Sequence, residues 1–133
     1  EPRVAMLSYS NFGSSPGKTS KKLEKAVSLV KSRNPELIID GEIHANIALS
    51  TETLKEVYPF SALKEAAHVL IFPDLNSGNI AYKLLTKIGG AQTIGPILLG
   101  LSKSVHVVQN GESLNTIVDM VAIAVVDAQS KED

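Results

Sequence analysis

Short apolar runs alternate with helix-like patterns along most of this chain, and this alternation constrains the fold more than any other feature. Three runs have the length and apolar character of buried strands: residues 3–8, 37–40 and 68–72. Between the first two, residues 19–33 repeat apolar side chains at helical spacing and carry lysines on the other face. Strands that alternate with helices in this way are typical of an α/β domain with a mainly parallel sheet.

The remaining elements continue the alternation. Short helices are expected at 43–49 and from a Ser50 cap through Val57, and a longer one from an Asn76 or Ser77 cap to about Ile88. Two more apolar runs have the pattern of strands, residues 93–99 and 105–108.

The last predicted helix, residues 113–129, is apolar on nearly every side. A helix of this kind is buried on most sides, and a chain of 133 residues has little core to cover it. We therefore expect a missing subdomain or subunit to pack on this helix. The chain begins with Glu1 and has no initiator Met, which indicates a piece of a longer protein. The tail, residues 130–133, is expected to be frayed.

Composition excludes several classes of function. With 44% hydrophobic and 20% charged residues, the chain is typical of one globular domain. A net charge of −1 offers no general attraction to nucleic acid or to an anionic membrane. The absence of cysteine excludes disulfides and thiolate metal sites. No run is long enough to span a membrane, so we expect a soluble, cytoplasmic protein without nucleic-acid or membrane partners.

The segment 11–20 contains a pattern similar to a phosphate-binding loop. Such a loop needs four residues between its first Gly and the Gly-Lys-Ser/Thr triplet, whereas Gly13 and Gly17 enclose three. Phe12 occupies the position that would restore the spacing, and Pro16 removes an amide donor. We favour a strand-to-helix loop whose Gly and Ser residues satisfy free helix amides, although any such loop can hold an anion.

Asp40, Glu42 and His44 alternate after the second predicted strand. On an extended segment they would share a face, which is one pattern for a metal site. Gly41 indicates that the strand is already ending, so exposed acids at the edge of the sheet are favoured and no metal site is expected. Open α/β sheets bind ligands at this edge, so Asp40 and Glu42 stay candidates for ligand binding.

Asp74, Asn76 and Asn79 follow the third predicted strand. Two interpretations stay open for them, turn and cap chemistry or ligand contacts at a crevice. His68 and His106 lie in apolar runs and are interpreted as packed residues. Spacing alone assembles no set of nucleophile, base and acid.

Several segments, taken in order, resemble the C-terminal part of the phosphate acetyl/butyryltransferase family: residues 4–10, 40–42, 69–84 and 95–100. Segments 10–14, 58–61 and 102–109 are more similar to the phosphotransacetylase-like domain fused to bacterial NADP-dependent malic enzymes. The resemblance implies a three-layer αβα fold of the isocitrate/isopropylmalate dehydrogenase type. It also implies that residues 1–112 form the second α/β subdomain, and that residues 113–133 form a helix and tail that return to an absent first subdomain.

The resemblance also implies which residues lie at the site. Active members of the family use a Ser-Arg pair before the final helix and an Asp at its start, and these positions hold Gln109, Asn110 and Thr116 here. A neutral amide cannot replace a guanidinium and Thr cannot replace a carboxylate base, so no catalytic residue is expected. The retained ligand-binding residues would be Ser10, Asn11, Gly13, Ser14, Asp40, Glu42, Asp74, Asn76 and Asn79.

The first functional hypothesis is a catalytically silent domain of an NADP-dependent malic enzyme. It would respond to acetyl-CoA, CoA or a related acyl-CoA and help to form a homo-oligomer. Another domain of the same chain would convert malate to pyruvate with NADP and a divalent metal. The alternatives are an active phosphate acetyltransferase, which moves acetyl between acetyl phosphate and CoA, and a purely structural dimerisation module.

Overall fold

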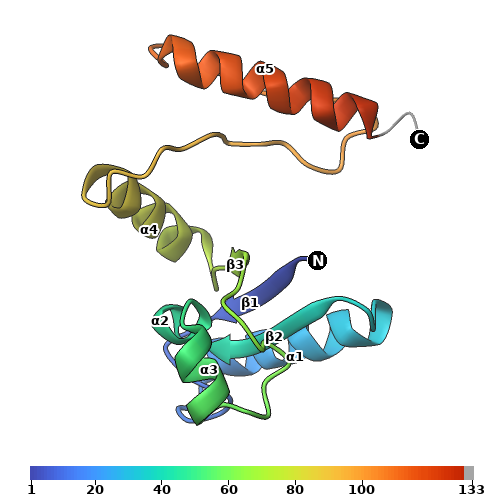
Figure 1. Cartoon of the computed structure of the whole chain (residues 1–133), viewed down its shortest axis with the longest axis vertical. Helices are drawn as coiled ribbons and strands as arrows, with labels where there is room; N and C mark the ends of the chain where they lie inside the picture. The colour runs from blue at the N-terminus through green and yellow to red at the C-terminus, as the bar shows by residue number, and fades with distance from the viewer. Residues whose placement is uncertain (131–133) are drawn as a thin grey trace. The chain divides into compact units, whose positions relative to one another are not determined.

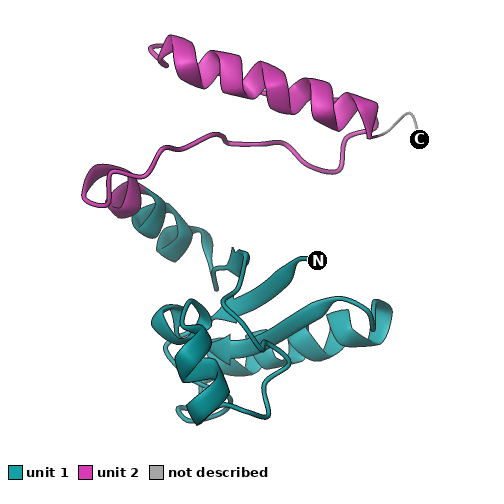
Figure 2. Cartoon of the chain, viewed as in Figure 1, with its two compact units in different colours: residues 1–82 teal, residues 83–133 magenta. Residues whose placement is uncertain are grey.

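The computed structural model describes residues 1–130 and forms two compact units, Glu1–Tyr82 and a second unit that begins at Lys83 (Figure 2). None of the helices in the described part is long and apolar enough to cross a membrane. Most of the tail predicted to fray, residues 131–133, lies outside the described residues. The predicted division at residue 112 refers to a subdomain outside this chain and stays a prediction.

The first unit is built on a three-stranded parallel sheet with the strand order β2-β1-β3 (Figure 1). The central strand β1 (Arg3–Leu7) pairs with β2 (Ile38–Ile43) on one side and with β3 (Val69–Ile71) on the other. Both pairings are parallel, which confirms the predicted α/β class and its parallel sheet.

Helices cover both faces of this sheet, because successive strand residues point to opposite sides. On one face, α1 (Lys18–Arg33) packs through Met6, Leu23, Val27 and Ile39. On the other face, α2 (Ala45–Ala48) and α3 (Thr51–Val57) help to bury a second cluster. That cluster contains Ala5, Leu7, Ile43, Ile47, Ala48, Leu54, Leu63 and Ala67. The unit therefore has three layers, while the dehydrogenase-like classification stays a prediction.

Side-chain caps set where two helices begin. The Ser50 side chain accepts a hydrogen bond from the amide of Thr53 at 3.2 Å, which confirms the predicted start of α3. The next helix, α4 (Leu75–Lys87), begins earlier than predicted. Its cap is Asp74, whose carboxylate accepts the amide of Ser77 at 2.9 Å, so the predicted cap at Asn76 or Ser77 was wrong.

The strand β2 continues past Gly41, whereas the sequence predicted that it would end at Asp40. Its register with β1 shifts so that Glu42 is an extra residue, which makes a β-bulge. Gly41 has φ of 136°, and a Cβ there would lie 2.6 Å from the carbonyl oxygen of Met6. The glycine therefore allows a bulge within the strand, and pairing with β1 resumes at Ile43.

In the second unit, α5 (Leu114–Gln129) begins after Ser113, whose side chain accepts the amide of Thr116 at 3.1 Å. Both ends agree with the predicted helix. Met120 is its only buried residue in the described chain, whereas Val118 and Val126 are 59% and 64% exposed. The expectation that another subdomain or subunit covers this apolar helix stays a prediction.

Residues 93–99 and 105–108 are not strands, contrary to the prediction. Within residues 1–130 the single sheet is the three-stranded one of the first unit, and neither run pairs with it. Apolar character favours a strand, but a strand forms only where a neighbour supplies hydrogen bonds along its length. The hydroxyl of Ser104 instead donates to the carbonyl of Ala124 at 3.0 Å, which holds the chain beside α5.

Candidate functional site

The candidate site lies at the carboxyl ends of β1 and β3, where the strand order reverses. From β1 the chain crosses to β2 on one side, and from β2 it crosses over to β3 on the far side of β1. The loops that follow β1 and β3 therefore leave the sheet at adjacent positions. Open α/β sheets bind ligands at this position. We call residues 8–17 and 72–79 the switch edge.

The buried carboxylate of Glu42 organises the loop after β1. Its Oε1 accepts hydrogen bonds from the hydroxyl of Ser10 at 2.7 Å and from the amide of Gly13 at 2.8 Å. Its backbone oxygen accepts the amide of Phe12 at 2.8 Å. Glu42 is only 2% exposed, so these donors replace the water that its carboxylate loses on burial. Three predicted site residues, Ser10, Gly13 and Glu42, are thus brought together.

The other backbone amides of residues 11–17 are also used, by acceptors in this segment, in Ser10 and in α1. The amide of Asn11 donates to the hydroxyl of Ser14, and the amide of Ser14 donates to the carbonyl of Asn11. The amides of Ser15 and Gly17 donate to the hydroxyls of Ser10 and Ser20, and Pro16 has no amide hydrogen. A phosphate-binding loop needs amides that are free to face its ligand. This segment is therefore a strand-to-helix loop, as the sequence indicated.

Asn11 joins this loop to the start of α2. Its side-chain oxygen accepts the amide of His44 at 2.7 Å, and the Nε2 of His44 lies 2.7 Å from the carbonyl oxygen of Tyr9. The imidazole of His44 thus contacts backbone. Within residues 1–130 no group of three or more His, Cys, Asp or Glu residues is arranged to hold a metal ion.

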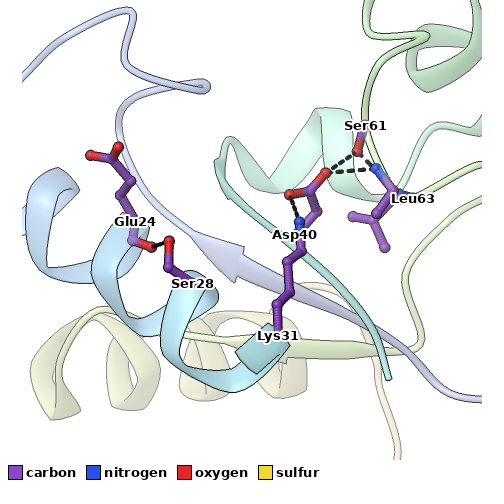
Figure 3. A network of polar contacts seen from close by, with 7 residues as sticks. Glu24, Ser28, Lys31, Asp40, Ser61 and Leu63 are labelled. Carbon is purple, nitrogen blue, oxygen red and sulfur yellow. Dashed lines mark hydrogen bonds and ion pairs between the residues drawn. The ribbon is translucent and has the colours of Figure 1, made fainter. Parts of the chain in front are cut away.

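Asp40 belongs to a separate network that ties β2 to α1 and to the loop of residues 61–62 (Figure 3). One oxygen lies 3.0 Å from the ammonium of Lys31 in α1, and the other accepts the hydroxyl of Ser61 at 2.9 Å and the amide of Ala62 at 2.7 Å. Asp40 is 7% exposed and Glu42 2%, so the prediction of exposed acids was wrong. The reason is that partners 9 to 32 residues away satisfy both carboxylates.

The loop after β3 is ordered by Asp74. Its carboxylate accepts both the amide and the hydroxyl of Ser77, at 2.9 Å and 3.1 Å. These hydrogen bonds hold the pKa of Asp74 below its usual 3.8, and the one from the Ser77 amide has the largest effect. The capping interpretation therefore describes Asp74. Asn76 and Asn79 are exposed on the first turns of α4.

The depressed pKa of Asp74 predicts a local acid transition. Because the native pKa lies below the unfolded one, the capping interaction is complete above about pH 4 and is lost as the pH falls through the native pKa. We expect the Ser77 amide resonance to titrate with that pKa in NMR spectra recorded from pH 6 to pH 2. In Asp74→Asn, which keeps the acceptor but cannot titrate, the resonance should stay fixed. Equal titration in both proteins would contradict the assignment.

Lys22 of α1 connects the helix to the second loop of the switch edge. Its Nζ donates to the carbonyl of Pro73 at 2.6 Å, and its charge contributes, as the smallest of the named causes, to the lowered pKa of Asp74. Lys22 was not among the predicted site residues. The one signal for it in the sequence was the lysine-rich face of α1.

The two histidines predicted to be packed have different surroundings. His68 is exposed and its Nε2 lies 2.9 Å from the guanidinium of Arg3. Its exposure follows from the position of β3 at the edge of the sheet, so the prediction was wrong for His68. His106 is half-buried in the second unit, 3.4 Å from the hydroxyl of Ser104.

Gln109, Asn110 and Thr116 lie in the second unit, at the turn before α5 and in its first turn. The carbonyl of Gln109 accepts the amide of Glu112 at 3.3 Å, and the hydroxyl of Thr116 lies 2.9 Å from that of Ser113. The side chain of Thr116 thus takes part in the helix cap. From residue 104 to residue 116 the sequence contains no Lys or Arg.

Comparison with known proteins identifies relatives of two kinds. The chain is 45% identical over 131 residues to an NADP-dependent malic enzyme of Haemophilus influenzae, which covers 98% of this chain and 17% of the relative. It is 43% identical over 129 residues to a phosphate acetyltransferase of Clostridium acetobutylicum, which covers 97% of this chain and 39% of the relative. The chain therefore spans well under half the length of these relatives.

A solved structure supports the same relationship. The phosphotransacetylase of Streptococcus pyogenes matches with a TM-score of 0.89 and 37% identity, over 97% of this chain and 39% of that one. The model of the family described as "Phosphate acetyl/butaryl transferase" matches residues 1–125. A match over nearly the whole length confirms the resemblance seen in the sequence, and the chain belongs to the phosphate acetyl/butaryl transferase family.

Proposed function

We propose that this domain binds acetyl-CoA or a related acyl-CoA at the switch edge and does not transfer the acyl group. The observation that carries the proposal is the set Gln109, Asn110 and Thr116, at the positions where the family resemblance implies Ser, Arg and Asp. Transfer from acetyl phosphate needs a cation for the phosphate and a base for the CoA thiol. The amide of Asn110 carries no charge, and the hydroxyl of Thr116 already contacts the helix cap.

The predicted ligand-binding residues divide into two groups by exposure. Asn11, Ser14, Asp74, Asn76 and Asn79 are at least partly exposed and would contact the ligand. Buried Ser10, Asp40 and Glu42 would act indirectly, because their polar atoms already bond within the protein. Gly13 would allow the turn of the loop, since its φ is 86°.

For the whole protein, we propose an NADP-dependent malic enzyme in which this chain is the C-terminal part of the phosphotransacetylase-like domain. Conversion of malate to pyruvate, with NADP and a divalent metal, would take place on another domain. Acyl-CoA binding here would regulate that reaction, and the domain would help to form a homo-oligomer. The identity to malic enzymes over 98% of this chain supports the assignment, and the exposed apolar face of α5 supports a contact with another subdomain or subunit.

The proposal predicts binding without turnover. Titration calorimetry of the full-length protein with acetyl-CoA should give a saturable heat, and acetyl-CoA should raise the melting temperature. An assay that follows thioester formation from acetyl phosphate and CoA should give no rate above the uncatalysed one. A clear rate would contradict the silent-domain proposal, and the absence of both heat and thermal shift would contradict acyl-CoA binding.

The second candidate is an active phosphate acetyltransferase, which the 43% identity to such an enzyme favours. Its catalytic groups would then come from residues other than Gln109, Asn110 and Thr116. The thioester assay separates the two candidates directly. Turnover that is lost in Asp74→Ala or Ser14→Ala would place the reaction at the switch edge.

A further inference from the structure

The first half of α1 presents four lysines on one face of the helix. They follow the spacing i, i+3, i+4 and i+7, which aligns side chains along one side, and all four are exposed. We call this set the lysine face: Lys18, Lys21, Lys22 and Lys25. The whole helix has six basic residues and one acidic residue, a net charge of +5, while the chain carries −1. The remainder of the chain therefore carries a net charge of −6.

This arrangement of charge is unfavourable for the helix itself. Lys18 and Lys22 form a like-charged i, i+4 pair, and so do Lys21 and Lys25. Cations in the first turns oppose the helix dipole, and the first turn contains no acidic residue. The one acid of the helix, Glu24, follows Lys21 by three positions and is outnumbered by these cations, so helix stability does not account for the lysine face.

Within the described residues no ion pair involves these lysines, although the charge of Lys22 acts on the nearby carboxylate of Asp74. Arg3 pairs with Glu65 and Lys31 pairs with Asp40, and neither ion pair involves the lysine face. Lys31 gives a contrast within the same helix, because it lies in the last turn, where the dipole favours a cation, and it is paired. The unpaired charge of the first turns is thus free to bind an external anion.

The contact between Lys22 and Pro73 places the lysine face at the switch edge. The Nζ of Lys22 donates to the Pro73 carbonyl at 2.6 Å, and Pro73 belongs to the loop after β3. One ammonium hydrogen is used there, and an ammonium group has three. The lysine face therefore begins beside the loops where the proposed ligand would bind.

We infer that the lysine face binds the phosphate groups of the nucleotide end of acyl-CoA. This inference rests on the proposed function and adds the part of the ligand that is recognised. The diphosphate and the 3′-phosphate of CoA together carry several negative charges. Flexible ammonium groups suit such a ligand, since they act as point charges and need no fixed bidentate geometry.

The test compares two variants of the full-length protein that lose the same charge. The first replaces the lysine face with Gln at all four positions. The matched control replaces four exposed lysines elsewhere, Lys55, Lys64, Lys87 and Lys103, with Gln. Calorimetry measures the affinity of each for acetyl-CoA, for dephospho-acetyl-CoA, which lacks the 3′-phosphate, and for S-acetylpantetheine, which has no phosphate.

We expect the lysine-face variant to bind acetyl-CoA about tenfold more weakly than the wild type, and the control variant to bind it nearly normally. Affinity of the wild type should fall as salt is raised, and the lysine-face variant should lose most of that dependence. Its affinity for S-acetylpantetheine should be unchanged, which would exclude misfolding.

Two other results would distinguish an error in this inference from an error in the proposed function. Wild-type affinity for acetyl-CoA in the lysine-face variant, or an equal loss in the control, overturns the inference and leaves the proposed function standing. Failure of the wild type itself to bind acetyl-CoA overturns the proposed function and this inference together.

Discussion

Replacing Glu42 with Ala is expected to lower the free energy of unfolding by about 3 kcal/mol, because it removes a buried charged acceptor. The change leaves the buried hydroxyl of Ser10 and the amide of Gly13 without their acceptor. Hydrogen exchange of the β1 and β2 amides in the full-length protein measures the loss, since those amides exchange only when the sheet opens. Residues 11–15 should become cleavable by protease.

Two variants isolate the role of the Glu42 carboxylate. Glu42→Gln keeps an acceptor oxygen and should destabilise the protein less than Glu42→Ala. Glu56→Ala removes an exposed carboxylate from α3, and we expect less than about 0.5 kcal/mol. If Glu42→Ala proved as mild as Glu56→Ala, Glu42 could not be what organises the loop.

Gly41→Ala is expected to have the second large effect, a loss of about 3 to 5 kcal/mol or a failure to fold. An added Cβ would lie 2.6 Å from the carbonyl oxygen of Met6, and that oxygen belongs to the central strand and cannot move aside alone. The φ of 136° adds strain for any residue with a side chain. The melting temperature and the exchange of β1 amides would report the loss.

Gly13→Ala is the matched control for Gly41→Ala. Gly13 also has a positive φ, of 86°, but a Cβ there would meet no atom within 4 Å. Only the backbone strain of a side chain at positive φ should therefore act, and we expect the free energy of unfolding to fall by about 1 to 2 kcal/mol. Equal losses at the two positions would show that the contact with Met6 is not what requires a glycine at 41.

Most of the first unit could be predicted from the sequence because local signals determine it. Apolar runs and helical spacing indicated the strands and α1, and Ser50 marked the start of α3 through capping chemistry. The prediction of strands at residues 93–99 and 105–108 was wrong for a physical reason. Their composition suits a strand, but strand formation depends on a partner, and composition does not reveal whether a partner is present.

The site was harder to predict because its contacts join residues far apart in the chain. Ser10 and Glu42 are separated by 32 positions, and Lys22 and Pro73 by 51. The acids at 40 and 42 were expected to be exposed, since nothing local in the sequence indicates that distant hydroxyls and amides satisfy them. Asp74 was easier to interpret, because its partner Ser77 lies within one helical turn.

The backbone amides of residues 11–17 that carry a hydrogen are all bonded to acceptors within the protein, so the shape of the loop is determined without help from any bound molecule. A molecule that arrives there would lose little affinity to ordering the chain, because that order already exists. Association should then follow a single kinetic phase whose rate rises in proportion to concentration, with no slow rearrangement after the encounter.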